Sequence, residues 1–139
     1  MTAKGIAQAF SPNYNSAKRS FQEVARHRGF QLLSLGLAVK GPEGEELTID
    51  IAWLGAENPR HVFIHSSGVH GVEAFAGSAI QIQWMQKSVT PVANDDAIVL
   101  VHALNPYGMA WLRRFNENNV DLNRNFREPG EYTPDPTPY

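Results

Sequence analysis

Apolar residues recur at helical spacing near the start of the chain. In the segments that follow Gly29, apolar and polar residues alternate. The helical set lies between polar start signals at 11–13 and Gly29, and it comprises Ala17, Phe21, Val24 and Ala25. This spacing predicts a helix that Gly29 ends. Three strands are expected after it, at 30–39, 47–54 and 61–65. A Gly-Pro-Glu-Gly turn separates the first two strands and predicts a hairpin.

A strand, loop, helix, strand order follows in the second half of the chain. The pattern predicts a helix over about 73–87, and 97–104 is an almost continuous apolar run of strand length. Such runs are typical of strands covered on both faces. We therefore expect an α/β fold, a mixed and largely parallel sheet flanked by helices in an α/β/α sandwich. The last stretch, 127–139, is rich in proline and is expected to be a loop.

Composition narrows the classes of function. The 139 residues carry a net charge of −2, and the pI is about 6.2, so no overall positive charge favours nucleic acid or an anionic membrane. No apolar run approaches the length of about 20 residues that a membrane span needs, and we expect a cytoplasmic protein. Cysteine is absent, so any metal site must use histidine and carboxylate ligands.

The most informative motif places a histidine and a glutamate three residues apart, directly after the strand at 61–65. His70 and Glu73 lie in a Gly-Val-His-Gly-Val-Glu loop, where an imidazole nitrogen and a carboxylate oxygen can converge on Zn²⁺. The alternative is a loop histidine beside an acidic residue favoured by the dipole of the following helix. The position favours a site, because ligands of open α/β sheets gather at the carboxyl ends of strands.

A second stretch concentrates arginine and asparagine after the next strand. It begins with Asn-Pro-Tyr-Gly at 105–108 and continues through Arg114 to the Asp-Leu-Asn-Arg-Asn-Phe segment at 121–126. Arginine offers a planar fork of donors that matches a carboxylate. Taken by itself, the stretch also fits an ordered loop whose asparagine side chains satisfy backbone groups.

Together, the two stretches resemble the zinc metallocarboxypeptidase superfamily, the carboxypeptidase A-like fold, in a bacterial branch. That family has a His-x-x-Glu loop, an Asn-Pro-x-Gly turn, an arginine and an Asp-x-Asn-Arg-Asn-aromatic segment in the same order. The match covers about 61–127. The aspartoacylase and succinylglutamate desuccinylase group shares this layout and is the nearest rival.

The resemblance implies a role for each matching residue. His70 and Glu73 would be ligands of one zinc ion, and Arg114 would polarise the scissile carbonyl and stabilise its oxyanion. Arg114, Asn123 and Arg124 would bind the substrate, the last two by gripping a terminal carboxylate. The family also needs a later histidine as third ligand and a later glutamate as general base, and neither is in this sequence. The remaining histidines are expected to be structural or surface residues and not zinc ligands: His27, His61, His65 and His102.

The sequence therefore predicts the N-terminal portion of one zinc-carboxypeptidase-like catalytic domain over 1–139. Its reaction would cleave an amide next to a free carboxylate, in a peptide or an acyl amino acid, with no nucleic acid or membrane partner. We expect the isolated chain to hold zinc weakly and to be inactive. Two alternatives stay open: an N-acyl amino acid deacylase, and a truncated, non-catalytic module that binds carboxylates or a partner. The oligomeric state is left open.

Overall fold

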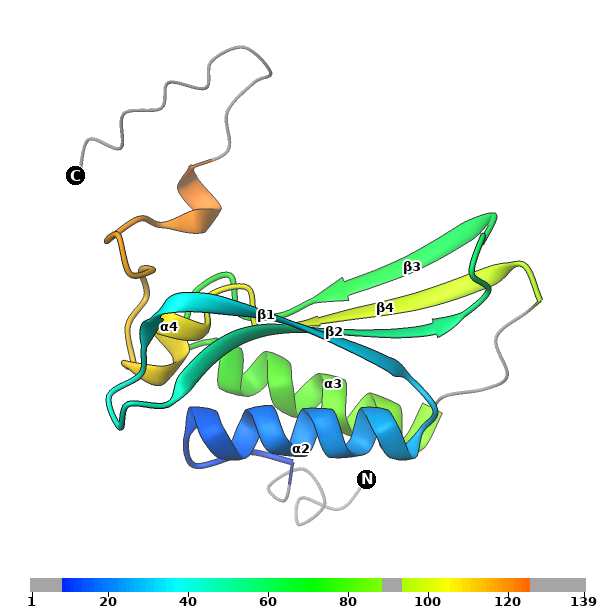
Figure 1. Cartoon of the computed structure of the whole chain (residues 1–139), viewed down its shortest axis with the longest axis horizontal. Coiled ribbons are helices and arrows are strands. Elements are labelled where there is room, and N and C mark those ends of the chain that lie inside the picture. Colours follow the sequence, from blue (N-terminus) through cyan, green and yellow to red (C-terminus); the bar gives the residue numbers. More distant parts are fainter. Residues whose placement is uncertain (1–8, 89–93, 126–139) are drawn as a thin grey trace.

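The computed structural model describes residues 9–88 and 94–125, which form helices and one β-sheet (Figure 1). The expected loop at 127–139 lies outside these residues. None of the helices in the described ranges has the length and apolar character needed to cross a lipid bilayer. The elements in chain order are α2 (Tyr14–His27), β1 (Gln31–Lys40), β2 (Glu46–Gly55), β3 (His61–Ser66), α3 (Ala74–Ser88), β4 (Asp96–His102), α4 (Pro106–Ala110) and the 3₁₀ helix η1 (Leu122–Arg124).

The four strands form one mixed sheet in the order β1-β2-β4-β3. The predicted α/β class, with a mixed sheet flanked by helices, is confirmed. The expectation of a largely parallel sheet is wrong for the described strands: β3 and β4 are parallel, but β2 pairs antiparallel with both β1 and β4. The hairpin partner β2 inserts beside β4, so the β3–α3–β4 crossover contributes a single parallel pair.

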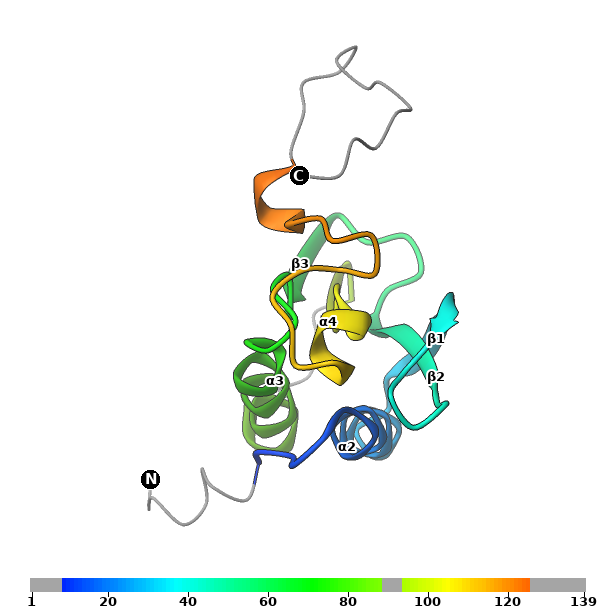
Figure 2. The ribbon, with the colours of Figure 1, turned by 90° about the vertical axis from the view of Figure 1, so that its left-hand side faces the viewer.

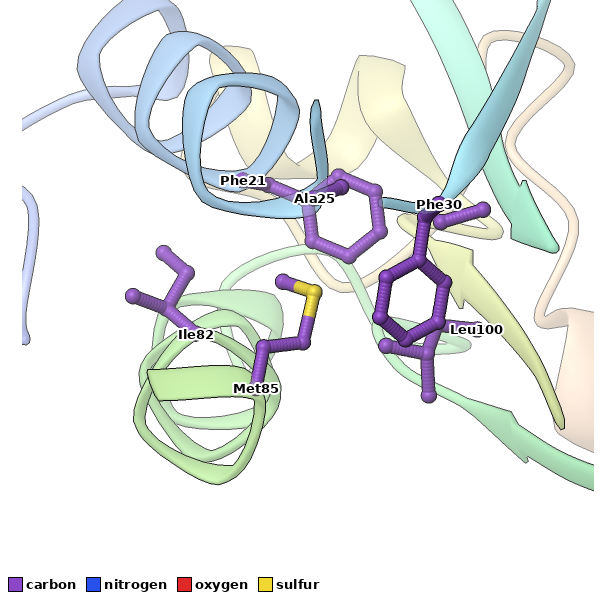
Figure 3. Close-up of a cluster of buried hydrophobic side chains, with 7 residues drawn as sticks. Phe21, Ala25, Phe30, Ile82, Met85 and Leu100 are labelled. Atoms are coloured by element: carbon purple, nitrogen blue, oxygen red, sulfur yellow. The ribbon is translucent and has the colours of Figure 1, made fainter. Parts of the chain in front are cut away.

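Helices α2 and α3 lie side by side on one face of this sheet (Figures 1 and 2). Asn13 caps α2 by accepting a hydrogen bond from the Ser16 amide at 2.9 Å. The buried apolar residues of α2 then repeat every three or four positions and face the sheet. Figure 3 shows the resulting core, in which α2, α3 and the sheet meet. Its buried members are Phe21, Ala25, Phe30, Ala52, Ile82, Met85 and Leu100.

The opposite face of the sheet is apolar but is not covered by the described residues. Leu33 is 56% exposed on β1 and Ile64 is 64% exposed on β3. Val99 and Val101 of β4, which lie between these strands, are only half-buried. The expectation that the apolar run of β4 is covered on both faces is therefore wrong for the described part of the chain, because both long helices pack on the same side.

Two buried polar residues lie opposite each other in the register of β2 and β4, Asp50 and His102. The Asp50 carboxylate accepts hydrogen bonds from Gln22 Nε2 at 3.1 Å and from Thr48 Oγ1 at 3.2 Å. The His102 ring stacks on Phe21 with centroids 4.6 Å apart, and its Nε2 lies 2.9 Å from Ser78 Oγ. Burial lowers the pKa of His102 from 6.5 to about 4, against the opposing attraction of Asp50.

This depressed pKa makes the chain less stable in acid. Below pH 6.5 the unfolded chain protonates His102, whereas the folded chain does not until about pH 4. We expect the free energy of unfolding to fall across this window by about 3 kcal/mol from this residue alone. Urea denaturation of wild type and His102→Gln at several pH values measures the effect, since the variant should lose this part of the slope. His27→Gln, at an exposed position of α2, should keep the wild-type slope; an unchanged slope in His102→Gln would contradict the assignment.

Candidate metal centre

The candidate site lies where the parallel strands β3 and β4 end, the edge of the sheet at which ligands of α/β folds gather. The loop after β3 runs beside the loop after β4: Leu104 N donates to Ser67 O at 2.9 Å, and Asn105 N donates to Gly68 O at 2.8 Å. The chain beyond α4 returns to the same place, because Val72 N donates to Arg113 O at 3.1 Å. Figure 2 views the molecule from this end.

Two glycines allow these segments to approach closely. Gly68 has a positive φ of 71°, a region that favours glycine. At Gly71, an added Cβ would lie 2.3 Å from the Gly108 Cα. No rotamer change can relieve this clash, because the contacted atom belongs to the backbone. The His-x-x-Glu loop is thus in direct backbone contact with α4.

His70 is at the centre of a polar cluster and uses both ring nitrogens. Its Nδ1 lies 3.2 Å from Glu73 Oε1, and its Nε2 lies 3.0 Å from Asp121 Oδ1. The second oxygen of Asp121 accepts from Arg114 Nε at 2.9 Å. The side chains of His70 and Asp121 are 10% and 14% exposed, whereas Glu73 is 66% exposed, so the cluster opens to solvent on the glutamate side.

The protonation of this cluster follows from Asp121. Burial alone would raise the pKa of Asp121, but hydrogen bonds from Arg114, His70 and the Asn123 backbone hold that pKa below its ordinary 3.8. The ionised carboxylate can only accept, so His70 Nε2 is the donor. His70 Nδ1 and Glu73 Oε1 then face each other with lone pairs. The short distance between these two acceptor atoms calls for a proton or a metal ion between them.

The spacing of that pair fits zinc. Zn–N and Zn–O bonds of about 2.0–2.2 Å at tetrahedral angles place two ligand atoms about 3.4 Å apart, close to the 3.2 Å between Nδ1 and Oε1. The carboxylate on the other ring nitrogen is the usual device that fixes a metal-binding histidine. Among the described residues, no cluster of three or more His, Asp or Glu side chains could hold a metal ion. The predicted pair is therefore brought together, without a third ligand in this part of the chain.

The predicted substrate-binding residues lie beside the pair. Arg114 keeps 44% of its side chain exposed while its Nε holds Asp121. Asn123 and Arg124 lie on η1, whose N-cap is Asp121. Asn123 N donates to Asp121 Oδ1 at 3.0 Å, and Arg124 N donates to Asp121 O at 3.0 Å. The side chains of Asn123 and Arg124 are exposed. The structure thus places Arg114, Asn123 and Arg124 along one short segment next to His70; their roles remain predictions.

Sequence reasoning missed the role of Asp121, which links His70 to Arg114. Its signal was its place at the head of the Asp-Leu-Asn-Arg-Asn segment, but only the fold shows that this segment reaches a histidine 51 positions earlier. Of the remaining histidines, His102 is fully buried, His61 pairs with Asp96 at 3.0 Å, and His65 lies near Gln81. None of these three joins the cluster around His70.

Two solved structures show a weak similarity to this chain. The glutaminyl cyclase of Fimbriiglobus ruber is 12% identical, with a TM-score of 0.45 over 70% of this chain and 42% of that protein. The glutaminyl cyclase of Porphyromonas gingivalis is 13% identical, with a TM-score of 0.37 over 71% of this chain and 47% of that protein. The chain thus spans less than half the length of either enzyme.

A family relationship covers almost the whole chain. No curated protein matches it. The model of one family matches residues 10–139, and its description is "Protein of unknown function (DUF2817)". The matched range contains the entire cluster around His70. The chain belongs to the DUF2817 family.

Proposed function

We propose that this chain carries the His-x-x-Glu part of the zinc site of a metallocarboxypeptidase-type hydrolase. The reaction is cleavage of an amide next to a free carboxylate. His70 and Glu73 hold the metal in this proposal, and a third ligand and a general base come from outside the described residues. The chain by itself is expected to be inactive.

One observation carries the proposal: the 3.2 Å approach of His70 Nδ1 and Glu73 Oε1, with Asp121 holding the other ring nitrogen. A histidine that only stabilises a loop has no need of carboxylates on both nitrogens. The same arrangement leaves two lone pairs aimed at one point and a ring that cannot rotate. That is the preorganisation a metal ligand requires.

In this proposal, the side chains of Arg114, Asn123 and Arg124 bind the substrate beside the metal. Zinc, when bound, supplies Lewis-acid chemistry that polarises a carbonyl. Arg114, oriented through its Nε, presents its remaining donors to the developing negative charge on that carbonyl oxygen. The exposed guanidinium of Arg124 and the amide of Asn123 bind the free carboxylate of the substrate by charge-assisted hydrogen bonds. The positive charges of Arg114 and Arg124 thus select an anionic end group.

Zinc titration of the ¹⁵N-labelled chain tests the metal half of this proposal. We expect saturable changes in the ring nitrogen resonances of His70, with one ion bound weakly, since only two protein ligands are present. The exposed His27 serves as an internal control whose resonances should not saturate with those of His70. His70 resonances that stay fixed at millimolar zinc would contradict the proposal.

The substrate half is tested with two ligands that share a free carboxylate. N-acetyl dipeptides and N-acetyl amino acids are added to the zinc-loaded chain, and backbone resonances of Asn123 and Arg124 are followed. Tighter binding of the dipeptide supports the peptidase assignment, and tighter binding of the acyl amino acid supports the deacylase. If neither ligand shifts these resonances, the carboxylate-binding role of Asn123 and Arg124 is wrong.

A further inference from the structure

Asn105 is a buried polar residue at the junction of all the segments that build the candidate site. It is 1% exposed and lies between the end of β4 and the first turn of α4. Its backbone N donates to Gly68 O at 2.8 Å, its Oδ1 accepts from Gly108 N at 2.7 Å, and its Nδ2 donates to Arg114 O at 3.2 Å. One side chain thus contacts both α4 and the segment that carries Arg114.

The carbonyl of Arg114 receives a second donor from the metal-ligand loop. Gly71 N lies 3.3 Å from the same oxygen, which is therefore shared between Asn105 and the residue next to His70. A continuous series of contacts runs from Asn105 to the Arg114 backbone, from Arg114 Nε to Asp121 at 2.9 Å, and from Asp121 to His70 at 3.0 Å. Displacement of the Arg114 backbone would break the later contacts of this series.

We propose that Asn105 is the positioning residue of the site: its Nδ2 fixes Arg114, and through Arg114 and Asp121 it fixes the His70 ring. The metal-binding part of this role rests on the function proposed above. The Oδ1 atom alone is enough to cap α4, so a residue that served only as a cap would not need the donor. Asn105 Nδ2, which donates to Arg114 O, is therefore the atom that connects the cap of α4 to the candidate site.

Substitutions can separate the cap from the donor. Asn105→Asp keeps an acceptor for Gly108 N and removes the donor to Arg114 O. Asn105→Ser also keeps a competent cap, while its hydroxyl is too short to span to the Arg114 carbonyl, and it decides the question if the aspartate variant does not fold. Asn13→Asp is the matched control, because Asn13 caps α2 through Oδ1 and is not part of the series of contacts from Asn105 through Arg114 and Asp121 to His70.

The readout is taken first on the metal-free chain by ¹⁵N NMR. In Asn105→Asp or Asn105→Ser we expect the Arg114 Nε–H resonance to lose the shift caused by Asp121, and the His70 ring nitrogens to lose the single tautomer pattern. Asn13→Asp should leave both signals unchanged. Wild-type signals of Arg114 and His70 in a folded Asn105 variant, whatever its thermal stability, would overturn the proposal.

Zinc titration of the same variants then separates this proposal from the one on which it rests. We expect folded Asn105 variants to bind zinc about 10-fold more weakly than wild type, at the lower end of the range for outer contacts of metal ligands. If wild type binds no zinc, the metal function fails, and the NMR signals of the metal-free chain still decide whether Asn105 positions Arg114 and His70. If wild type and variants bind zinc equally, the positioning role fails while the metal function stands.

Discussion

His70→Ala is expected to abolish saturable binding of zinc or cobalt. The substitution removes one of the two protein donor atoms of the pair and leaves the exposed Glu73 carboxylate as a monodentate ligand in water. The visible absorption of added Co²⁺ measures the effect, since cobalt in a nitrogen-containing protein site differs in spectrum from the hydrated ion. A cobalt spectrum in His70→Ala equal to that of wild type would show that the metal binds elsewhere.

Asp121→Asn tests the same centre without touching a ligand. Its amide can replace only part of the acceptor capacity that now serves His70, Arg114 and the Asn123 backbone. We expect the affinity for zinc or cobalt to fall about 10- to 100-fold, with Glu117→Gln, at an exposed position in the same segment, as the control of matched chemistry. An unchanged affinity in Asp121→Asn would contradict the orienting role of this carboxylate.

Phe21→Ala is expected to cause the largest loss of stability in the helix-facing core. Phe21 is fully buried and its ring packs between α3 and the sheet and against His102. Removal of a buried phenylalanine side chain costs about 3–5 kcal/mol, a large share of the 5–15 kcal/mol that typically separates folded from unfolded domains.

Urea denaturation followed by circular dichroism measures this loss as a lower transition midpoint. Phe10→Ala provides the matched control, because Phe10 is 50% exposed, and surface substitutions of this kind change stability by about 0.5 kcal/mol or less. A midpoint shift in Phe21→Ala no larger than that of Phe10→Ala would show that the core does not depend on α2 in the way described.

Local signals were enough to predict the two long helices and the four strands, and to choose a position for the candidate site. Asn13, the helical spacing around Phe21, and Gly29 define α2, and the apolar run of β4 marks a sheet strand. The His-x-x-Glu loop could be located because it directly follows β3, and the ends of parallel strands are where α/β folds place their ligands.

What could not be predicted depends on contacts between distant segments. β2 inserts beside β4 with Asp50 opposite His102 in the register, and no local pattern encodes that choice. The packing of both long helices on one face, which leaves Leu33 and Ile64 exposed, is likewise a tertiary outcome. Asp121 and Asn105 belong to a stretch whose sequence also fits an ordered loop, and only the return of the chain after α4 gives them their contacts to His70 and Arg114.

In the proposed function, the link between His70 and Asp121 also ties metal binding to the free energy of folding. These residues are 51 positions apart, so the oriented imidazole exists in the folded chain and not in the unfolded one. By thermodynamic linkage, an ion that binds only the folded form raises stability by about 2.7 kcal/mol when its free concentration is 100 times its dissociation constant. The metal site proposed at one edge of the sheet is thereby coupled to the stability of the fold.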